Sequence, residues 1–309
     1  MKNVSAVIPN YNGQSLLKKF LPYVLRTLDN NDELIVVDDN STDNSIKYLI
    51  KEYKLKLTKQ LKIKNIVSKE YFPQLKNIKY KLCKNNIKVG KNNINLILIS
   101  LEENMRFAAA ANTGVLFSNN DYILLLNSDV KPTKELRNQL IQHFNDPLIF
   151  GVGCLEYEKD ETGEKSGKNK LWFYRGMFMH SKAQDMSSGP TAWVSGGSGM
   201  FDKQKWIYLN GFDQLFYPAY WEDLDLSYRA RKEGWKTLFD EKAVVYHIHE
   251  STNMDIFGQQ KIMHMSWLNL SKYLKKHATF WQLIQYYFYK PYWIYAWWKH
   301  NKKMNKIII

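Results

Sequence analysis

The stretch Asp121–Asp129, DYILLLNSD, is an apolar run that ends abruptly in three polar residues. It fits two interpretations: a buried strand that stops in an ordinary turn, or a buried strand that brings a carboxylate to a metal and a phosphate. Both interpretations use the same residue types, so the stretch alone does not decide between them. The sequence around it provides the context.

Similar short runs, rich in β-branched and aliphatic residues, occur at Val4–Pro9, Leu34–Asp38 and Ile94–Ser100, and Tyr122–Leu126 is the fourth. Helical patterns lie between or after them, at Gln14–Leu28, Ser45–Tyr53, Phe107–Phe117 and Lys134–Phe144. Strands that alternate with helices predict an α/β layer fold built on a mostly parallel sheet.

The chain has 309 residues and 45% hydrophobic content, enough for a sizeable core. We expect one body at about 1–255, with halves at about 1–130 and 131–255, and a helical extension at 256–309. The lysine-rich segment at about 55–93 is longer than a compact connection requires, and we interpret it as an insertion.

The net charge of +14 is unevenly distributed. Lysines gather at 47–91 and after residue 255, and the body between and around these segments is acidic. An acidic body suits a cation or a metal-bound diphosphate, so no nucleic-acid partner is expected. The alternative for 47–91 is a coding bias that places lysines on solvated faces. Two cysteines form no disulfide framework, and the N-terminus lacks the pattern of a signal peptide, which together favour a cytoplasmic location.

The segment 280–303 combines aromatic rings with lysines. It contains no apolar run of roughly 18 residues, which a membrane span requires. Amphipathic rings beside lysines favour the headgroup layer, so we expect this segment to lie on a membrane. The alternative is a helical hairpin that packs its rings on the body or on another subunit.

Polar clusters follow all four predicted strands, where an open parallel sheet places ligand residues. Pro9, Tyr11 and Asn12 follow the first strand, and Asp38 and Asp39 end the second. A carboxylate there can accept a base N–H or a ribose hydroxyl, although Asp before Asn-Ser-Thr is also an ordinary turn.

After the third strand, Glu103–Gly114 opens an alanine-rich helix that includes Asn104, Arg106 and Asn112. Free N–H groups at a helix N-terminus suit a phosphate or a base carbonyl. The alternative is a helix buried on its alanine face, which explains the alanines better than it explains Arg106 and Asn112.

Asp129, at the end of the fourth strand, is placed to bind Mg or Mn that shares its oxygens with a diphosphate, and Asn127 is a weaker oxygen donor. Glu222 and Asp223, beside Trp221, begin a helix, where a carboxylate can act as general base. The alternative for the acids of this helix is a salt bridge to Arg229 or Arg231, which we prefer for Asp225.

The ordered set of motifs resembles family-two glycosyltransferases of the GT-A fold, particularly bacterial enzymes similar to rhamnosyltransferases. The matching pieces cover roughly residues 3–252: VIPNYNG, VVDDNSTD, ENMRFAAAANTG, LLLNSD, WVSGGSGMF, NGFDQLFYPAYWEDLDLSYRARKEGW and VVYHIHEST. The resemblance implies a Rossmann-like nucleotide-sugar half and an acceptor half around a mixed central sheet.

The resemblance also implies roles for single residues. Asp129 and His247, with His249 less favoured, would contact the metal, Asp223 with Glu222 beside it would deprotonate the acceptor, and Trp221 and Gly197 would contact the acceptor. The residues implied at the nucleotide sugar are Pro9, Tyr11, Asn12, Asp38, Asp39, Asn104, Arg106, Asn112, Asn127 and Ser128.

The implied activity is inverting transfer of a sugar from dTDP-rhamnose or a UDP-sugar, assisted by Mg or Mn. The acceptor would be a hydroxyl of a cell-surface glycan or a lipid-linked molecule at the inner face of the cytoplasmic membrane. The competing hypothesis is a non-catalytic nucleotide- or nucleic-acid-binding protein on a GT-A-like scaffold.

Overall fold

The computed structural model describes residues 2–62, 72, 75, 78–160, 162–247 and 252–307. Its strands are β1 (Val4–Asn10), β2 (Glu33–Asp38), β3 (Lys56–Lys62), β4 (Lys79–Val89), β5 (Asn92–Leu101), β6 (Tyr122–Leu126), β7 (Val130–Pro132), β8 (Ile149–Glu158), β9 (Lys165–Ser166), β10 (Asn169–Tyr174), β11 (Met177–Lys182), β12 (Gly189–Pro190), β13 (Ser198–Asp202) and β14 (Lys236–His247). Its α-helices are α1 (Gln14–Thr27), α2 (Ser45–Glu52), α3 (Arg106–Phe117), α4 (Leu136–Ile141), α5 (Lys203–Tyr208), α6 (Glu222–Lys232), α7 (Thr252–His277) and α8 (Phe280–Ile307).

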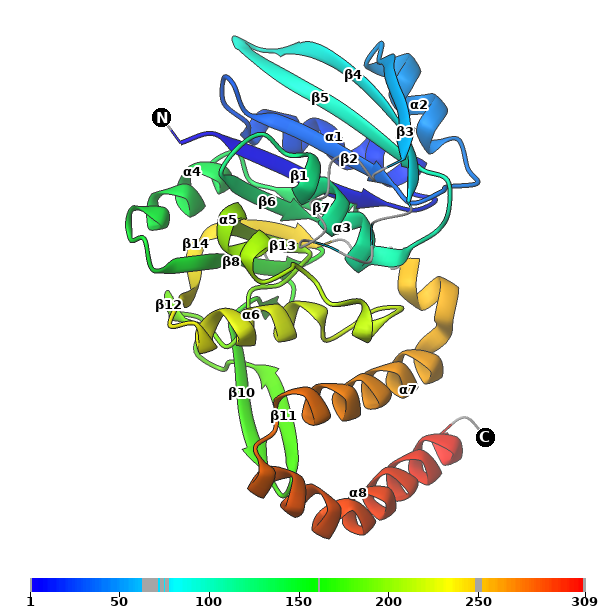
Figure 1. Ribbon diagram of the computed structural model, residues 1–309, viewed down its shortest axis with the longest axis vertical. Coiled ribbons are helices and arrows are strands. Elements are labelled where there is room, and N and C mark those ends of the chain that lie inside the picture. Colours follow the sequence, from blue (N-terminus) through cyan, green and yellow to red (C-terminus); the bar gives the residue numbers. More distant parts are fainter. Residues whose placement is uncertain are drawn as a thin grey trace.

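One large mixed sheet organises the body, in the order β12-β14-β8-β13-β6-β1-β2-β5-β4-β3 (Figure 1). Strands β6, β1, β2 and β5 run parallel, as the alternating pattern predicted. Strand β13 is antiparallel to both β6 and β8, so it reverses the direction in the second half of the sheet. The predicted α/β fold with a mixed central sheet is confirmed.

Helices cover both faces of this sheet. Leu17, Leu21 and Val24 of α1 pack on one face with Ile8 and Val36 of the strands. On the other face, the alanines of α3 lie against Val7 and Val37. A Cβ on Gly114 would lie 2.3 Å from Val7 Cγ1, so this glycine lets α3 approach the sheet closely.

The lysine-rich segment 55–93, which we interpret as an insertion, contains regular strands that the sequence did not predict. Its described parts form strand β3 and strand β4, and β4 pairs antiparallel with β5. In β4, Tyr80 and Leu82 are buried while Lys79 and Lys81 are exposed, which is the two-residue period of a strand with one solvated face. The lysines therefore belong to the solvent side of an extension of the sheet.

The C-terminal part is helical, as expected. The expected boundary at 255/256 lies within the range of α7, just before a kink at Gly258 (φ 71°, ψ 155°) that separates two helical segments. Leu270, Tyr273 and Leu274 of α7 are buried against the body, together with Phe178 of the β10–β11 hairpin and Trp221. Helix α8 lies beyond this hairpin, at the end of the molecule opposite β4 and β5 (Figure 1).

Candidate active site

A cavity of about 710 Å³ opens where the parallel strands β1, β2 and β6 end. Segments far apart in the sequence line it, from the loop after β1 to Ile262 of α7. The predicted site residues that it brings together are Pro9, Tyr11, Asp39, Asn104, Arg106, Asn127, Ser128, Asp129, Gly197, Glu222, Asp223 and His247. This edge of the sheet is where open α/β folds place their ligands.

Asp39 connects the end of β2 to the start of α3. One carboxylate oxygen accepts the backbone N–H of Met105 and the other accepts the N–H of Arg106, each at 2.7 Å. Burial raises the pKa of Asp39 to about 6, although these two hydrogen bonds work in the opposite direction. Asp39 therefore fixes the helix N-terminus beside the cavity that it also lines.

Asp38 and Asn12, predicted to bind the nucleotide sugar, do not line the cavity. Asp38 is fully buried, and its carboxylate accepts hydrogen bonds from Asn10 Nδ2 and from the Ser41 hydroxyl and N–H. The Asn12 side chain accepts the N–H of Thr42 at 2.8 Å. Both residues stabilise the loops after β1 and β2.

Asn112, predicted to line the nucleotide, is also placed elsewhere. It is fully buried in α3, donates to the carbonyl of Phe212, and accepts from Trp206 Nε1 and from the N–H of Phe212. Its amide joins α3 to the loop after α5. The polar residue on the alanine-rich helix is thus explained by a buried hydrogen-bond network.

The NSD ending of β6 faces the Gly-rich loop before β13. The N–H of Asn127 donates to the carbonyl of Gly197 at 2.8 Å. A Cβ on Gly197 would lie 2.6 Å from Asn127 Nδ2, so a larger residue at 197 would displace this amide. Gly197 lines the cavity, and its carbonyl also fixes the backbone of Asn127 through this hydrogen bond.

His247 meets Asp129 because β14 pairs with β7, opposite Val130. Its Nε2 lies 3.2 Å from Asp129 Oδ1, and its Nδ1 lies 3.8 Å from Glu156 Oε2. Burial alone would lower the pKa of His247, but the two carboxylates outweigh burial and raise it to about 10. His249, the less favoured alternative to His247, lies outside the described residues.

Glu156 was not predicted from the sequence. It stands near the end of β8, where it also hydrogen-bonds the Ser198 hydroxyl. The signal that was available is a charged residue ending the apolar run Ile149–Leu155, the same feature that identified Asp129. Glu158, two residues further along, lines the cavity, whereas Glu156 reaches it only through His247.

The first turn of α6 brings two carboxyl groups to the cavity. Asp223 accepts the N–H of Leu224 at 2.7 Å and the N–H of Gly196 at 3.3 Å. Glu222 is buried, and its Oε2 has no hydrogen-bond partner among the described residues. Burial and the charge of Asp223 raise the pKa of Glu222 to about 8, so at neutral pH the neutral form of Glu222 is favoured beside the hydrogen-bonded Asp223.

Trp221, predicted to contact the acceptor, points into the protein. Its backbone is left-handed (φ 80°), its ring packs near Tyr273 and His180, and its Nε1 donates to Ser266 Oγ at 3.2 Å. It joins α6 to α7 and does not line the cavity.

Asp225 behaves as the salt-bridge interpretation predicted. It is fully buried and lies 2.8 Å from Arg229 Nε. It also contacts Lys276 and His277 of α7, which the sequence did not indicate. This buried cluster fixes α7 against the helix that carries Asp223.

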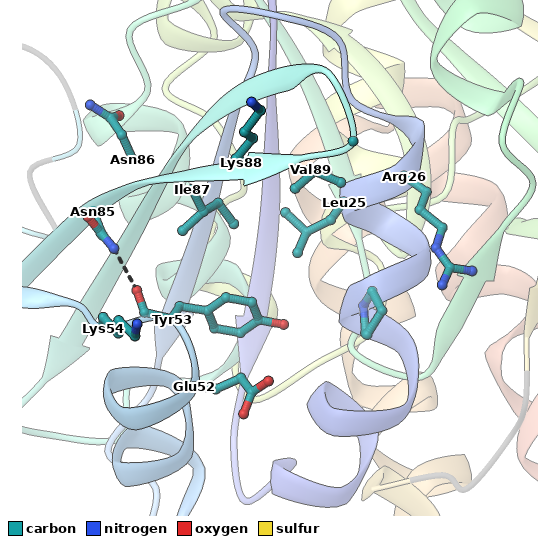
Figure 2. A pocket seen from close by; sticks show the side chains of 12 residues that line it. Leu25, Arg26, Glu52, Tyr53, Lys54, Asn85, Asn86, Ile87, Lys88 and Val89 are labelled. Carbon is teal, nitrogen blue, oxygen red and sulfur yellow. Dashed lines mark hydrogen bonds between the residues drawn. The ribbon is translucent and has the colours of Figure 1, made fainter.

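A second cavity, of about 580 Å³, lies between α1, the end of α2 and β4 (Figure 2). Leu25, Ile87 and Val89 contribute apolar side chains, and Asn85 donates to the carbonyl of Tyr53 at 2.8 Å. None of the predicted site residues lines this cavity. The cavity at the strand ends, with its converging carboxylates, is therefore the candidate active site.

No three His, Cys, Asp or Glu side chains in the described part of the chain form a group that could hold a metal ion by themselves. The donor set at the strand ends is the pair Asp129 and His247. Magnesium sites at nucleotides commonly use one or two protein ligands and complete their coordination with phosphate oxygens and water. His247 can ligate a metal only as neutral imidazole, so a bound ion would displace its proton; on that condition the pair fits a divalent ion that is shared with a diphosphate.

Comparison with known sequences agrees with this geometry. The sequence model described as Glycosyl transferase family 2 matches residues 5–71 and 77–205. Over 155 residues the chain is 26% identical to the pre-mycofactocin glycosyltransferase of Mycobacterium tuberculosis, strains CDC 1551 and H37Rv. This match covers 48% of the chain and 31% of the relative, so the chain spans about a third of that protein's length.

Solved structures share the fold. GalNAc-T7 with UDP, GalNAc and Mn²⁺ superposes with a TM-score of 0.55 at 15% identity, over 81% of this chain and 44% of that one. The mannosyltransferase PcManGT from Pyrobaculum calidifontis, in complex with GDP-Man and Mn²⁺, gives 0.54 at 14% identity, over 92% and 72%. The family match covers more than half of the chain, and the chain accordingly belongs to glycosyl transferase family 2.

Proposed function

We propose that this protein is an inverting glycosyltransferase that moves a sugar from a nucleoside diphosphate sugar to an acceptor hydroxyl. One observation carries the proposal: Asp223, a candidate base, lines the same cavity as the strand-end residues Tyr11, Asp39 and Asp129. A single cavity can therefore hold a donor against the sheet and an acceptor against α6.

The donor side is formed by the ends of β1, β2 and β6 with the start of α3. Tyr11 offers a ring for the base, Asp39 offers a carboxylate near the ribose, and Arg106 offers a cation to the phosphates. The structural neighbours hold UDP and GDP-Man, which supports a nucleotide-sugar donor. We propose dTDP-rhamnose or a UDP-sugar for this chain.

The chemistry follows from a single displacement. The acceptor oxygen forms its bond to the anomeric carbon as the bond to the diphosphate breaks on the opposite face, and the diphosphate leaves with the electron pair. Asp223 accepts the hydroxyl proton, and its hydrogen bonds from Gly196 and Leu224 orient the carboxylate. Asp129 and His247 would hold Mg or Mn, which when bound offsets negative charge on the leaving group.

The acceptor side is formed by the start of α6, the Gly196–Gly197 loop and Ile262 of α7. We propose a hydroxyl of a cell-surface glycan or a lipid-linked molecule as acceptor, at the inner face of the cytoplasmic membrane. Trp221 takes no part in this, because its ring lies in the core beneath α6.

The test begins with a screen of nucleotide sugars for thermal stabilisation, with and without Mn²⁺, because a ligand bound only by the native state raises the melting temperature. The stabilising donor is then assayed for transfer to candidate acceptors, and the product anomer is assigned by NMR. Metal-dependent stabilisation by one donor and an inverted product are expected. Strong, salt-sensitive RNA binding with no donor turnover would instead support the non-catalytic alternative.

A further inference from the structure

Helix α8 presents two different faces. Leu283, Tyr286 and Trp293 pack inward on the cluster formed by the β10–β11 hairpin and α7. Opposite them, large side chains recur every three or four residues and are exposed: Phe280, Trp281, Ile284, Tyr287, Phe288, Tyr292, Ile294, Tyr295 and Trp298. Phe288 is 76% exposed and Trp281 is 71% exposed, so this outward face is uncovered by the described chain. An aromatic face of this size marks an interaction site.

The hairpin holds α8 in a fixed orientation. Trp293 Nε1 donates to the carbonyl of Arg175 at 2.8 Å, and the Arg175 guanidinium lies 5.1 Å from the ring centre of Tyr292. Gly176, with φ of 78°, lies so close to α8 that a Cβ would be 2.5 Å from Tyr286 Cα. The hairpin adds exposed Trp172 and Tyr174 of its own beside this contact.

The charge around the outward face has a single sign. From Ile256 onward the sequence contains nine lysines and no acidic residue. Lys290 and Lys299 are exposed on α8, and Arg175 is exposed at the hairpin tip. Lys290, together with Tyr287 and Trp298, lines a shallow cavity of about 520 Å³ on α8. Rings and lysines on one surface match the headgroup layer of a bilayer that carries negative charge.

We propose that the outward face of α8 and the tip of the β10–β11 hairpin form one surface that lies flat on an anionic lipid bilayer. We call it the aromatic-basic surface. No helix in the described part of the chain is long and apolar enough to cross a membrane. A second copy of the chain fits this surface less well than a bilayer does. In a two-fold dimer through this face, lysines of one copy would lie against lysines of the other, and the segment has no acidic residue to pair with them.

The surface is connected to the catalytic body through α7. Lys276 and His277, at the end of α7, contact the buried Asp225 of α6, the helix that carries Asp223 in its first turn. Ile262, earlier in α7, lines the active-site cavity. A bilayer bound to α8 would therefore stand at a fixed position relative to the acceptor side of the cavity.

The test is co-sedimentation of the full chain with vesicles of 70% phosphatidylcholine and 30% phosphatidylglycerol, compared with pure phosphatidylcholine. We expect binding to the anionic vesicles that weakens in high salt. The combined variant Phe280→Ser, Trp281→Ser and Phe288→Ser should lose at least about ten-fold in affinity, because it removes the rings that enter the headgroup layer. The pair Lys290→Gln and Lys299→Gln should weaken binding to anionic vesicles only.

Tyr208→Ser is the control, because Tyr208 is also an exposed aromatic residue, at 60% exposure, but lies on α5. It should bind vesicles as the unaltered protein does, and all variants should keep their melting temperature. Equal vesicle binding by the unaltered protein and the triple-serine variant would overturn the proposal. The proposal would also fail if the unaltered protein bound no vesicles but formed a dimer in light scattering that the triple-serine variant did not form. Since the assay needs no donor sugar, its outcome is independent of the proposed transfer activity.

Discussion

Two pairs of neighbouring carboxyl groups lie at the active-site cavity, and the fold gives their members different surroundings. At the end of β2, Asp38 turns into the protein and Asp39 lines the cavity. At the start of α6, Glu222 and Asp223 both line it. Neighbours in a strand point to opposite sides, whereas neighbours in a helix turn by only about 100° and stay together.

The two pairs also differ in how their oxygens are satisfied. Both oxygens of Asp38 and both of Asp39 accept hydrogen bonds from the protein. At α6, Glu222 keeps one oxygen without a partner among the described residues. The strand-end pair thus fixes loops and a helix terminus. At α6, Asp223 also accepts two backbone N–H groups, so among these four carboxyl groups Glu222 is the one that keeps an oxygen without a partner among the described residues.

The substitution with the largest expected effect is Asp223→Asn, which tests whether the α6 pair supplies the general base. An amide cannot accept the acceptor's proton, so kcat should fall by about 10²–10⁴-fold, the usual contribution of a general base. Donor-induced thermal stabilisation should stay the same. Burial raises the pKa of Asp223, so the rate of the unaltered enzyme should also fall in mildly acidic buffer as this carboxylate takes up a proton.

Asp185→Asn is the control for this variant, since Asp185 is an exposed carboxylate that does not line the cavity. It should leave turnover unchanged. Full turnover by Asp223→Asn would remove the general-base assignment and leave α6 as a structural helix.

A second substitution pair extends the comparison to the end of β6. Asp129→Asn should weaken Mn²⁺ binding in the presence of UDP by on the order of 10–100-fold, because a carboxylate ligand is replaced by a neutral amide. Asn127→Asp should strengthen it, since it adds a carboxylate beside the same cavity. Calorimetric titration of Mn²⁺ measures both. If neither substitution changed the Mn²⁺ affinity, the end of β6 would be an ordinary turn without a metal ligand.

A third pair tests the structural role of the β2 carboxylates. In Asp39→Asn, an amide NH₂ replaces one of the two oxygens that accept backbone N–H groups, so one N–H loses its acceptor. This loss should cost about 1–3 kcal/mol of stability and raise the donor KM. Asp38→Asn should cost less, because Asn10 can turn its amide and offer its Oδ1, which has no partner among the described residues, to the new NH₂. Urea unfolding and donor kinetics separate the two. A larger loss from Asp38→Asn would contradict this view.

Much of the fold was predictable because its elements are local. The expected strand Tyr122–Leu126 matches β6, and Gln14–Leu28 extends one residue beyond α1. The strand-end carboxylate Asp129 was found because a polar ending to an apolar run is visible in the sequence. The strands in the lysine-rich segment were missed, because alternation with lysine on the solvated face gives a weak hydrophobic signal.

Side-chain direction was less predictable, because it depends on contacts far along the chain. Asn112 looked like a ligand, but its amide binds Phe212, a hundred residues away. Trp221 looked like an acceptor platform, but its left-handed backbone turns the ring toward Tyr273. Glu156 reaches the site only because β8 lies beside β14, and no local pattern reports that pairing.

The smallest expected effect concerns Glu222, whose pKa of about 8 lies above its ordinary value of 4.5. Between these values the unfolded chain ionises first, so native stability should fall as the pH rises from about 4.5 to 8. Glu222→Gln removes this dependence and should be more stable than the unaltered protein at pH 8.5, by at least about 1.4 kcal/mol, the equivalent of one pKa unit. Denaturant unfolding at pH 5 and 8.5 measures it, with exposed Glu241→Gln as control. Parallel pH curves for Glu222→Gln and the unaltered protein would mean that Glu222 is ionised in the native state.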